Sequence, residues 1–218
     1  MQLQDQEPQS ESLYEAILDD ISRGKLVGGQ RLKISELAAR FGVSASPVRE
    51  ALRQMQGEGF VDIHQNRGAT VRRANASTIQ NTFEVLQLLS PYFVSWFAEN
   101  ADPAVIEELA AVQDQIRVLD NSDAYTFRKL DGQFHAIISN FHYNDVAADT
   151  WNKLRIALSV HTAQLPISRA RLKNIVAEHD ALIAAFRAGD PVEADRVIRL
   201  HVQGSYTQIS QHIRALGG

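Results

Sequence analysis

A chain of 218 residues with 44% hydrophobic side chains can fill one large or two modest cores, and its length favours two domains. The sequence has no cysteine, which excludes disulfides and thiolate metal sites. It also has no secretory signal and no apolar run of spanning length, so we expect a protein of a reducing bacterial cytoplasm without a membrane partner. The net charge of −4 is unevenly spread: residues 22–74 hold ten Lys or Arg and four Asp or Glu, whereas residues 75–218 hold twelve and sixteen. Such a local basic excess attracts phosphate groups.

The first residues, 1–12, are rich in Gln and Glu, and we expect them to form a mobile tail. Apolar residues at helical spacing predict a first helix from Leu13 that stops at Gly24. Two short helices joined by a tight turn are predicted within residues 35–60, where Gly42 ends the first of them. This arrangement is typical of a helix-turn-helix.

The second of these helices has an apolar face, which packs, and a polar face that is free to touch a partner. Its N-terminus is well defined, because Ser44 or Ser46 can cap it and Pro47 fits its first turn. Cap hydroxyls, free backbone N–H groups and Arg49 gather at this positive end, which suits a phosphate or a base edge in the major groove. We interpret it as a DNA recognition helix; the alternative is an amphipathic helical hairpin with a solvated basic face. The apolar face consists of Val48, Leu52 and Met55, and the polar face of Ser46, Arg49 and Arg53.

Residues 60–64 and 69–71 are predicted to form two short strands around a turn, with Arg67 and Gly68 at or near its tip. A helix-turn-helix followed by a β-hairpin is a winged helix, whose wing offers a basic tip to the minor groove or the DNA backbone. The predicted DNA-binding residues are Ser35, Ser44, Ser46, Arg49, Arg53, Arg67 and Gly68.

Several blocks of this region recur in register with a known family: Gly24-Lys25-Leu26, Arg31-Leu32, Glu36-Leu37-Ala38, Phe41-Gly42-Val43-Ser44, Pro47-Val48-Arg49-Glu50-Ala51-Leu52, Glu58-Gly59 and Gly68. Residues 13–71 resemble the N-terminal domain of GntR-family transcription regulators. The chain departs from the family twice, with Gly28-Gly29 in place of the usual Pro-Gly and Ala45 in place of an Arg that reaches guanine in relatives. A family operator sequence is therefore not assumed here.

Residues 74–77 are the predicted linker, and Ser77 can cap the helix that follows it. Helix after helix is then predicted, with no convincing strand, which gives an antiparallel bundle with short loops over residues 78–218. The fold class is mainly α, with a winged helix-turn-helix over residues 13–73 followed by an all-helical domain. The six predicted helices are Ile79–Glu99, Ala104–Leu119, Ala124–Phe141, Val146–Leu165, Leu172–Ala188 and Val192–Leu216.

Four polar residues lie on faces of these helices that are otherwise apolar. Asp131 and His135 are four residues apart on the third helix, whereas His179 and His201 lie on the fifth and sixth. A buried, unpaired Asp needs a cation or hydrogen-bond donors, and imidazoles with one carboxylate suit zinc or nickel, with manganese or iron as further options. We therefore predict a divalent metal bound by these four residues. The alternative is a set of satisfied core histidines.

The same residues carry a second resemblance, through Asp131-x-x-Phe134-His135, Glu178-His179 with Leu182, and Asp195 with Arg199-x-His201. These blocks look like the FCD effector-binding domain of the FadR subfamily of GntR regulators, and six helices place the chain with the shorter, VanR-like branch. All four positions that bind metal in such domains are filled here. Leu86 stands where relatives commonly have an Arg associated with carboxylate effectors. Either the metal and other donors hold the effector here, or the effector is not a simple dicarboxylate.

The two resemblances together imply a ligand-responsive transcription regulator, commonly a repressor. It would act as a homodimer on a near-palindromic operator, with a small organic acid that coordinates the metal as effector. The alternative from another class is a metal-dependent phosphohydrolase, because His179-Asp180 is an HD doublet in a helical domain. A third interpretation keeps the regulator but makes the metal purely structural. The remaining histidines, His64, His142, His161 and His212, are expected to be ordinary surface or loop residues.

Overall fold

The computed structural model describes residues 9–65, 67–73 and 75–215. Its contacts separate into two compact units, which we describe one at a time. Of the described residues, the first contains 9–65, 67–73 and 159–164, and the second contains 75–158 and 165–215. Within the described ranges, no helix has both the length and the apolar character that crossing a membrane would require.

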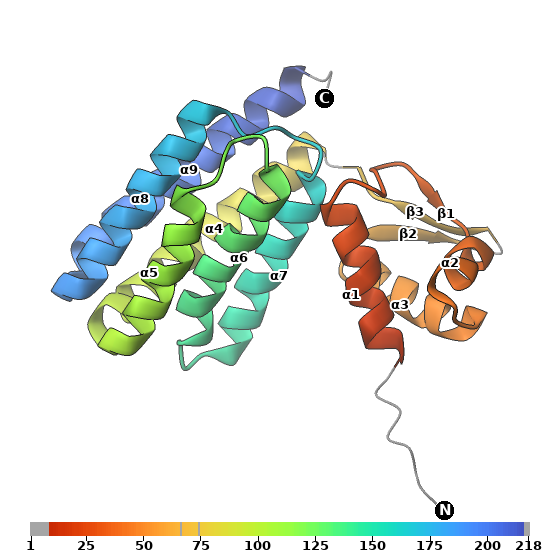
Figure 1. The fold of residues 1–218 in the computed structure, drawn as a ribbon, viewed down its shortest axis with the longest axis horizontal. Coiled ribbons are helices and arrows are strands. Elements are labelled where there is room, and N and C mark those ends of the chain that lie inside the picture. Colours follow the sequence, from red (N-terminus) through yellow and green to blue (C-terminus); the bar gives the residue numbers. More distant parts are fainter. Residues whose placement is uncertain (1–8, 66, 74, 216–218) are drawn as a thin grey trace, which may run out of the picture. The chain divides into compact units, whose positions relative to one another are not determined.

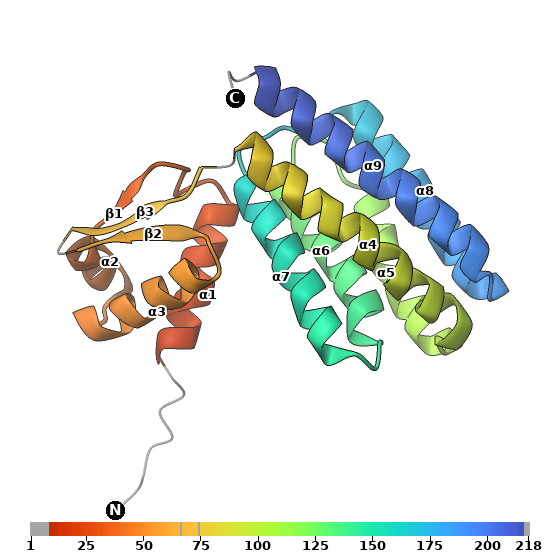
Figure 2. The same cartoon turned by 180° about the vertical axis from the view of Figure 1, so that it is seen from behind.

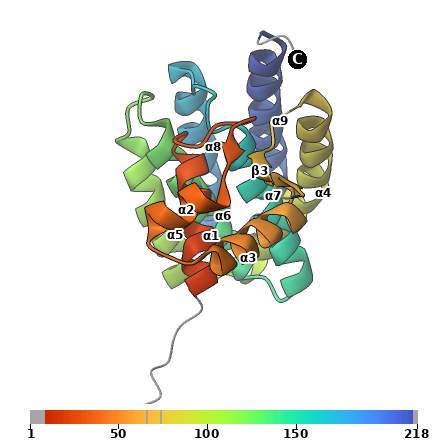
Figure 3. The same cartoon turned by 90° about the vertical axis from the view of Figure 1, so that its right-hand side faces the viewer.

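The first unit is a winged helix-turn-helix, as predicted (Figure 1; Figure 3 shows α2 and α3 facing the viewer). Its strands form an antiparallel sheet in the order β1-β3-β2, with Val61 opposite Val71 and His64 opposite Gly68. The helices are α1 (Gln9–Ser22), α2 (Ile34–Phe41) and α3 (Ala45–Gly57), and the strands are β1 (Arg31–Leu32), β2 (Val61–His64) and β3 (Gly68–Val71).

The turn between α2 and α3 follows from local sequence. Gly42 ends α2 with a φ of 67°, a left-handed conformation that costs glycine little, and its N–H bonds to the carbonyl of Ala38. Ser44 occupies the N-cap position of α3 in an extended conformation, but its hydroxyl makes no capping hydrogen bond and stays exposed. The apolar face predicted for α3 is confirmed, since Val48, Leu52 and Met55 are at most 1% exposed.

Three expectations for the first unit and the linker that follows it need correction. The sheet has a third strand, β1, which was missed because two residues are too short to show an alternating pattern. Helix α1 begins at Gln9 rather than Leu13, so part of the predicted tail is helical, while residues 1–8 lie outside the described ranges. Helix α4 begins at Ala76 and is capped by Asn75, whose Oδ1 accepts from the Thr78 N–H at 2.7 Å, rather than by Ser77.

The second unit is an all-helical bundle over the described residues 75–215 (Figure 2). Helix α4 packs along α9, α8 packs on α9 and α5, and α5 packs on α6. The six predicted helices are confirmed, although the predicted fourth one ends at His161 instead of Leu165. They are α4 (Ala76–Asn100), α5 (Pro103–Arg117), α6 (Ala124–Asn140), α7 (Asp145–His161), α8 (Arg169–Ala188) and α9 (Pro191–Ala215).

Large aromatic side chains fill the bundle core. Phe93, Phe97, Phe134 and Trp151 are fully buried, and the Phe93 and Trp151 rings stack at a centroid distance of 4.7 Å. Each such side chain stabilises the fold by about 1.5–3 kcal/mol through removal from water. This dry interior makes any polar group inside it expensive unless it has a partner.

Candidate nucleic-acid interface and metal centre

A groove of about 600 Å³ lies between α3 and the strands of the winged helix. Four of the predicted DNA-binding residues contribute cationic or polar groups to its walls: Ser35, Arg49, Arg53 and Arg67. All four are exposed, and no Asp or Glu is among the described residues of its lining. A concave surface whose described charged side chains are all basic, beside an exposed helix N-terminus, can bind the phosphates and base edges of DNA.

The other predicted DNA-binding residues, Ser44, Ser46 and Gly68, differ in their position relative to the groove. Ser44 and Ser46 are exposed at the start of α3 but do not line the groove, whereas Ala45 between them does. Gly68 lines it with a φ of 82°, and a Cβ at this position would stand 2.2 Å from the Leu32 carbonyl oxygen. Glycine is therefore required there by the close approach of β1 to the wing, whatever its part in DNA contact.

Three further basic side chains line this groove that the sequence did not lead us to predict as DNA-binding: Arg31, Lys33 and His64. Arg31 lies on the missed strand β1, and its Nε donates to the Arg67 carbonyl at 3.0 Å, which ties β1 to the wing turn. The basic excess of residues 22–74 was the signal that could have suggested them.

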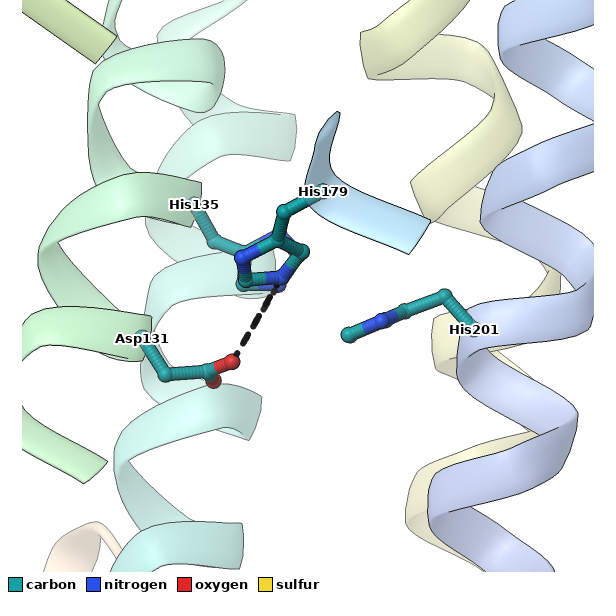
Figure 4. Close-up of side chains that lie close together, drawn as sticks. All are labelled: Asp131, His135, His179 and His201. Carbon is teal, nitrogen blue, oxygen red and sulfur yellow. Dashed lines mark ion pairs between the residues drawn. The ribbon is translucent and has the colours of Figure 1, made fainter. Parts of the chain in front are cut away.

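The four predicted metal ligands meet in the interior of the second unit. Asp131 and His135 from α6, His179 from α8 and His201 from α9 point toward one another (Figure 4), and each offers a ligand atom within 4.8 Å of the others. A tetrahedral cation with bonds of 2.0–2.2 Å would hold such atoms about 3.3–3.6 Å apart, so the side chains would have to close by about an ångström around it. The three imidazoles are 0–3% exposed, which makes the centre almost dry.

Neighbouring side chains orient two of the imidazoles. Nδ1 of His179 lies 3.1 Å from Oε1 of the fully buried Gln113, and Nδ1 of His201 lies 2.9 Å from Oε2 of Glu178. Because both partners are acceptors, Nδ1 is the donor in each ring, and Nε2 is the nitrogen that remains for a cation. Nε2 of His179 is buried and has no hydrogen-bond partner within the described ranges. The same holds for both ring nitrogens of His135.

Each orienting group is itself fixed. The Gln113 amide donates to the Val176 carbonyl at 3.0 Å and to Oδ1 of Asp180 at 2.8 Å, which decides which way its Oε1 points. Glu178 accepts from Nη1 of Arg171 at 2.7 Å. Burial alone would raise the pKa of Glu178, but hydrogen bonds from His201 and Arg171 hold that pKa below its usual value.

Burial also lowers the pKa of His135 and of His179 well below the usual value, and nearby cationic groups act in the same direction. Both rings are consequently neutral, which is the form that binds metal. Unpartnered nitrogen lone pairs in a dry interior, together with one carboxylate, form a donor set that fits a divalent transition metal.

The carboxylate of this set has a second partner. Oδ1 of Asp131 lies 3.9 Å from His135 Nε2 and 3.7 Å from His179 Nε2, whereas Oδ2 accepts from Nη2 of Arg155 at 2.6 Å. Sequence reasoning missed Arg155 and Gln113. A polar residue on the apolar face of α5 was the available signal for Gln113, which lies among the buried Leu109, Val112 and Ile116.

Four further histidines are expected in surface or loop positions, and His142 does lie in a loop, between α6 and α7, but it is buried. His142 is 3% exposed among aromatic rings, and its Nδ1 accepts from the Asn144 N–H at 3.0 Å in the turn before α7. Its burial was not expected, because side chains distant in sequence can cover a loop residue and periodicity does not reveal them. His64 is exposed, whereas His161 and His212 are half-buried within α7 and α9.

The HD doublet does not form a second ligand pair. Asp180 accepts from Gln113 and, at 2.7 Å, from Nη2 of Arg117, so it faces away from the cluster. Its role is to hold the residue that orients His179. The geometry therefore argues against a phosphohydrolase centre, in which both members of the doublet would bind metal.

Two family models match the chain, one in each unit. Residues 9–71 match the family of bacterial regulatory proteins, gntR family, and residues 81–204 match the FCD domain. The chain belongs to the GntR family and carries an FCD domain. Members of this family regulate transcription through DNA binding and are not enzymes, so the phosphohydrolase alternative is wrong.

Individual relatives of the chain extend over nearly its whole length. It is 30% identical to the transcriptional repressor NanR of Klebsiella aerogenes, over 95% of this chain and 86% of NanR. It is 28% identical to the Nta operon transcriptional regulator of Aminobacter aminovorans, over 85% of this chain and 87% of the relative. The solved structure of Escherichia coli McbR/YncC shares the fold, with a TM-score of 0.83 and 19% identity over 93% of this chain and 97% of that one.

Proposed function

We propose that this GntR-family regulator is a repressor whose DNA affinity responds to a small organic acid bound at a metal centre in its FCD domain. The observation that carries the proposal is the set of three inward imidazoles and Asp131, whose ligand atoms converge within 4.8 Å in a nearly dry interior. Zinc or nickel suits these donors best, and manganese or iron would also fit. When bound, the cation would supply Lewis-acid positions for the oxygen atoms of an acid.

On the DNA side, we propose that Arg49 and Arg53 of α3 contact base edges and phosphates, and that Arg67 contacts the DNA backbone from the wing. Their shared groove, the exposed N-terminus of α3 and the lack of acidic groups in the described lining support this assignment. Ser35, Ser44, Ser46 and Gly68 complete the proposed interface through hydroxyl and backbone groups. Ala45 offers no donor to guanine, so the operator should differ from that of relatives with Arg there.

We further propose a symmetric homodimer, because two recognition helices related by a dyad would read a near-palindromic operator. An apolar stripe on α4 is the surface that we assign to the second copy. Val85, Leu88 and Tyr92 share one helix face and are 38%, 75% and 39% exposed. Sedimentation should show a dimer for the wild type and a monomer for Leu88→Glu, whereas Val118→Glu, at another exposed apolar position, should remain dimeric.

The functional test uses protein purified without a His-tag and an operator selected from random duplexes. Metal content is measured first, and operator affinity is then followed by fluorescence anisotropy while organic acids are added to metal-loaded and chelator-treated protein. We expect one class of acid to weaken operator binding only when metal is present. Protein that takes up no transition metal would contradict the metal-coordinated effector. Metal without any acid response would leave the metal with a structural role.

A further inference from the structure

Arg155 of α7 reaches the candidate metal centre through Asp131. Its Nη2 donates to Asp131 Oδ2 at 2.6 Å, while Oδ1 of the same carboxylate faces the nitrogens of His135 and His179. The side chains of Arg155 and Asp131 are only 14% and 18% exposed, so this ion pair lies largely out of water. One carboxylate thus has one oxygen toward the imidazoles and the other toward a guanidinium.

The Arg155 guanidinium is held in place by its surroundings, but not all of its N–H groups have a hydrogen-bond partner. It lies 5.6 Å from the ring centroid of Trp151, one turn earlier on α7, and the indole N–H of this buried Trp donates to Ser90 Oγ at 3.1 Å. Nε of Arg155 is buried, and the described residues provide no hydrogen-bond partner for it. A positioned cation with an unused N–H donor therefore borders the cluster.

With a divalent metal bound, the centre would lack negative charge. Without metal, Asp131 and Arg155 form an ion pair of zero net charge beside the three imidazoles. The other buried pair next to the centre, Glu178 with Arg171, is also neutral. A divalent cation bound by Asp131 and three neutral rings would leave two positive charges in excess. Uncompensated charge in a dry interior is strongly unfavourable, so the loaded centre requires an anion.

We infer that Arg155 and the bound cation together form the receptor for the carboxylate of the effector, with the guanidinium as the group that selects anions over neutral ligands. This inference rests on the metal centre proposed above and adds a specificity-determining residue to it. A planar guanidinium is suited to this task, because its fork of N–H donors matches the two oxygens of a carboxylate.

The inference predicts effects of opposite sign on the two ligands. Arg155→Gln removes a positive charge that repels the cation and competes for Asp131, so zinc affinity should be unchanged or higher. The same change removes a charge-assisted donor, so carboxylate affinity should fall about tenfold or more. Arg155→Lys should restore part of the carboxylate affinity. A purely structural role for Arg155 would instead weaken both ligands together.

The experiment measures zinc affinity by chelator competition and zinc stoichiometry by elemental analysis. Calorimetry on zinc-loaded protein then follows the binding of acetate and glycolate, with acetamide as an uncharged control ligand. Arg199→Gln serves as the matched control variant, because Arg199 is exposed on α9 and pairs with Asp195 rather than with the cluster. It should behave as the wild type in every measurement.

The outcomes separate this inference from the proposed function. Wild-type binding of acetate or glycolate only when zinc is loaded, lost in Arg155→Gln with zinc retained, supports it. Equal carboxylate affinity in wild type and Arg155→Gln overturns the role of Arg155 alone, as does loss of zinc from this variant. Zinc uptake without carboxylate binding overturns the anion receptor but leaves the metal. A wild type that takes up no zinc overturns both proposals.

Discussion

The groove of the winged helix and the cluster of the FCD domain are both built from polar side chains, but the fold treats them in opposite ways. In the groove, Arg49 and Arg53 are exposed and can adopt the geometry that a DNA partner requires. In the cluster, His179 and His201 are buried and each is held by a neighbouring acceptor. The difference fits the proposed roles: a surface for a large, highly charged partner can remain adaptable, whereas the proposed site for a small ion has to be oriented in advance.

The largest effect is expected at the groove, for Arg49→Ala. Two copies of this residue on one operator would each lose base contacts of about 1–3 kcal/mol, which should abolish specific binding. Because the side chain is exposed, the unfolding free energy should hardly change. Gel shifts with operator and random duplexes measure the first effect and urea unfolding the second, with Arg23→Ala, outside the groove lining, as control. Operator affinity equal to that of wild type would remove Arg49 from the interface.

For the cluster, we expect His179→Ala to lose the stabilisation by metal but to keep DNA binding, the reverse of Arg49→Ala. The wild type should gain about 2.7 kcal/mol of stability at a hundredfold excess of free metal over its dissociation constant, and the variant should gain nothing. Operator binding by the variant without effector should persist, since the winged helix has its own core. Thermal unfolding with and without chelator, paired with a gel shift, tests both expectations. A variant melting curve that still responds to metal would exclude His179 as a ligand.

A smaller effect should follow from disturbing only the orientation of a ligand. Gln113→Leu keeps a side chain of similar size but leaves Nδ1 of His179 without its acceptor, so metal affinity should fall about 10–100-fold. Gln115→Leu, two residues along α5 and exposed, is the matched control. Chelator competition gives both affinities. If the two variants bind metal equally well, the cluster does not depend on the orientation that Gln113 imposes.

The buried His142, outside the cluster, allows protonation to be examined without metal. Burial lowers the pKa of His142, and its Nδ1 must remain unprotonated to accept from Asn144. The unfolded chain therefore binds a proton more readily, and stability present above pH 6.5 should be lost as pH falls, by at most about 1.4 kcal/mol per pH unit. Urea unfolding from pH 7.5 to 5.5 in chelator should show a shallower loss for His142→Phe. Identical slopes would mean that His142 keeps an ordinary pKa when folded.

The smallest effect belongs to Arg67→Ala in the wing. If Arg67 contacts a phosphate, all sequences should bind more weakly by a similar factor, and the salt dependence of binding should flatten by about one charge per protomer. Operator and random duplexes titrated at several salt concentrations give the slope. A loss confined to the operator would instead show that the wing reads sequence.

The sequence by itself determined the kind and order of the elements, because apolar spacing, glycine and proline positions and caps act over a few residues. It also predicted the four cluster residues, since helical periodicity dictates which side of a helix faces the core, and Asp131, His135, His179 and His201 all lie on such sides. The family resemblance supplied the function, which the family matches then showed at the level of a DNA-binding regulator.

Only the tertiary structure decided which residues surround those positions. Gln113 meets His179 across 66 residues of chain, and Arg155 meets Asp131 from another helix. The strand β1 exists only because β3 pairs with it, and this pairing brings Arg31 to the wing turn. Helical spacing tells which way a side chain points but not what it meets, because the partner is set by how whole elements pack.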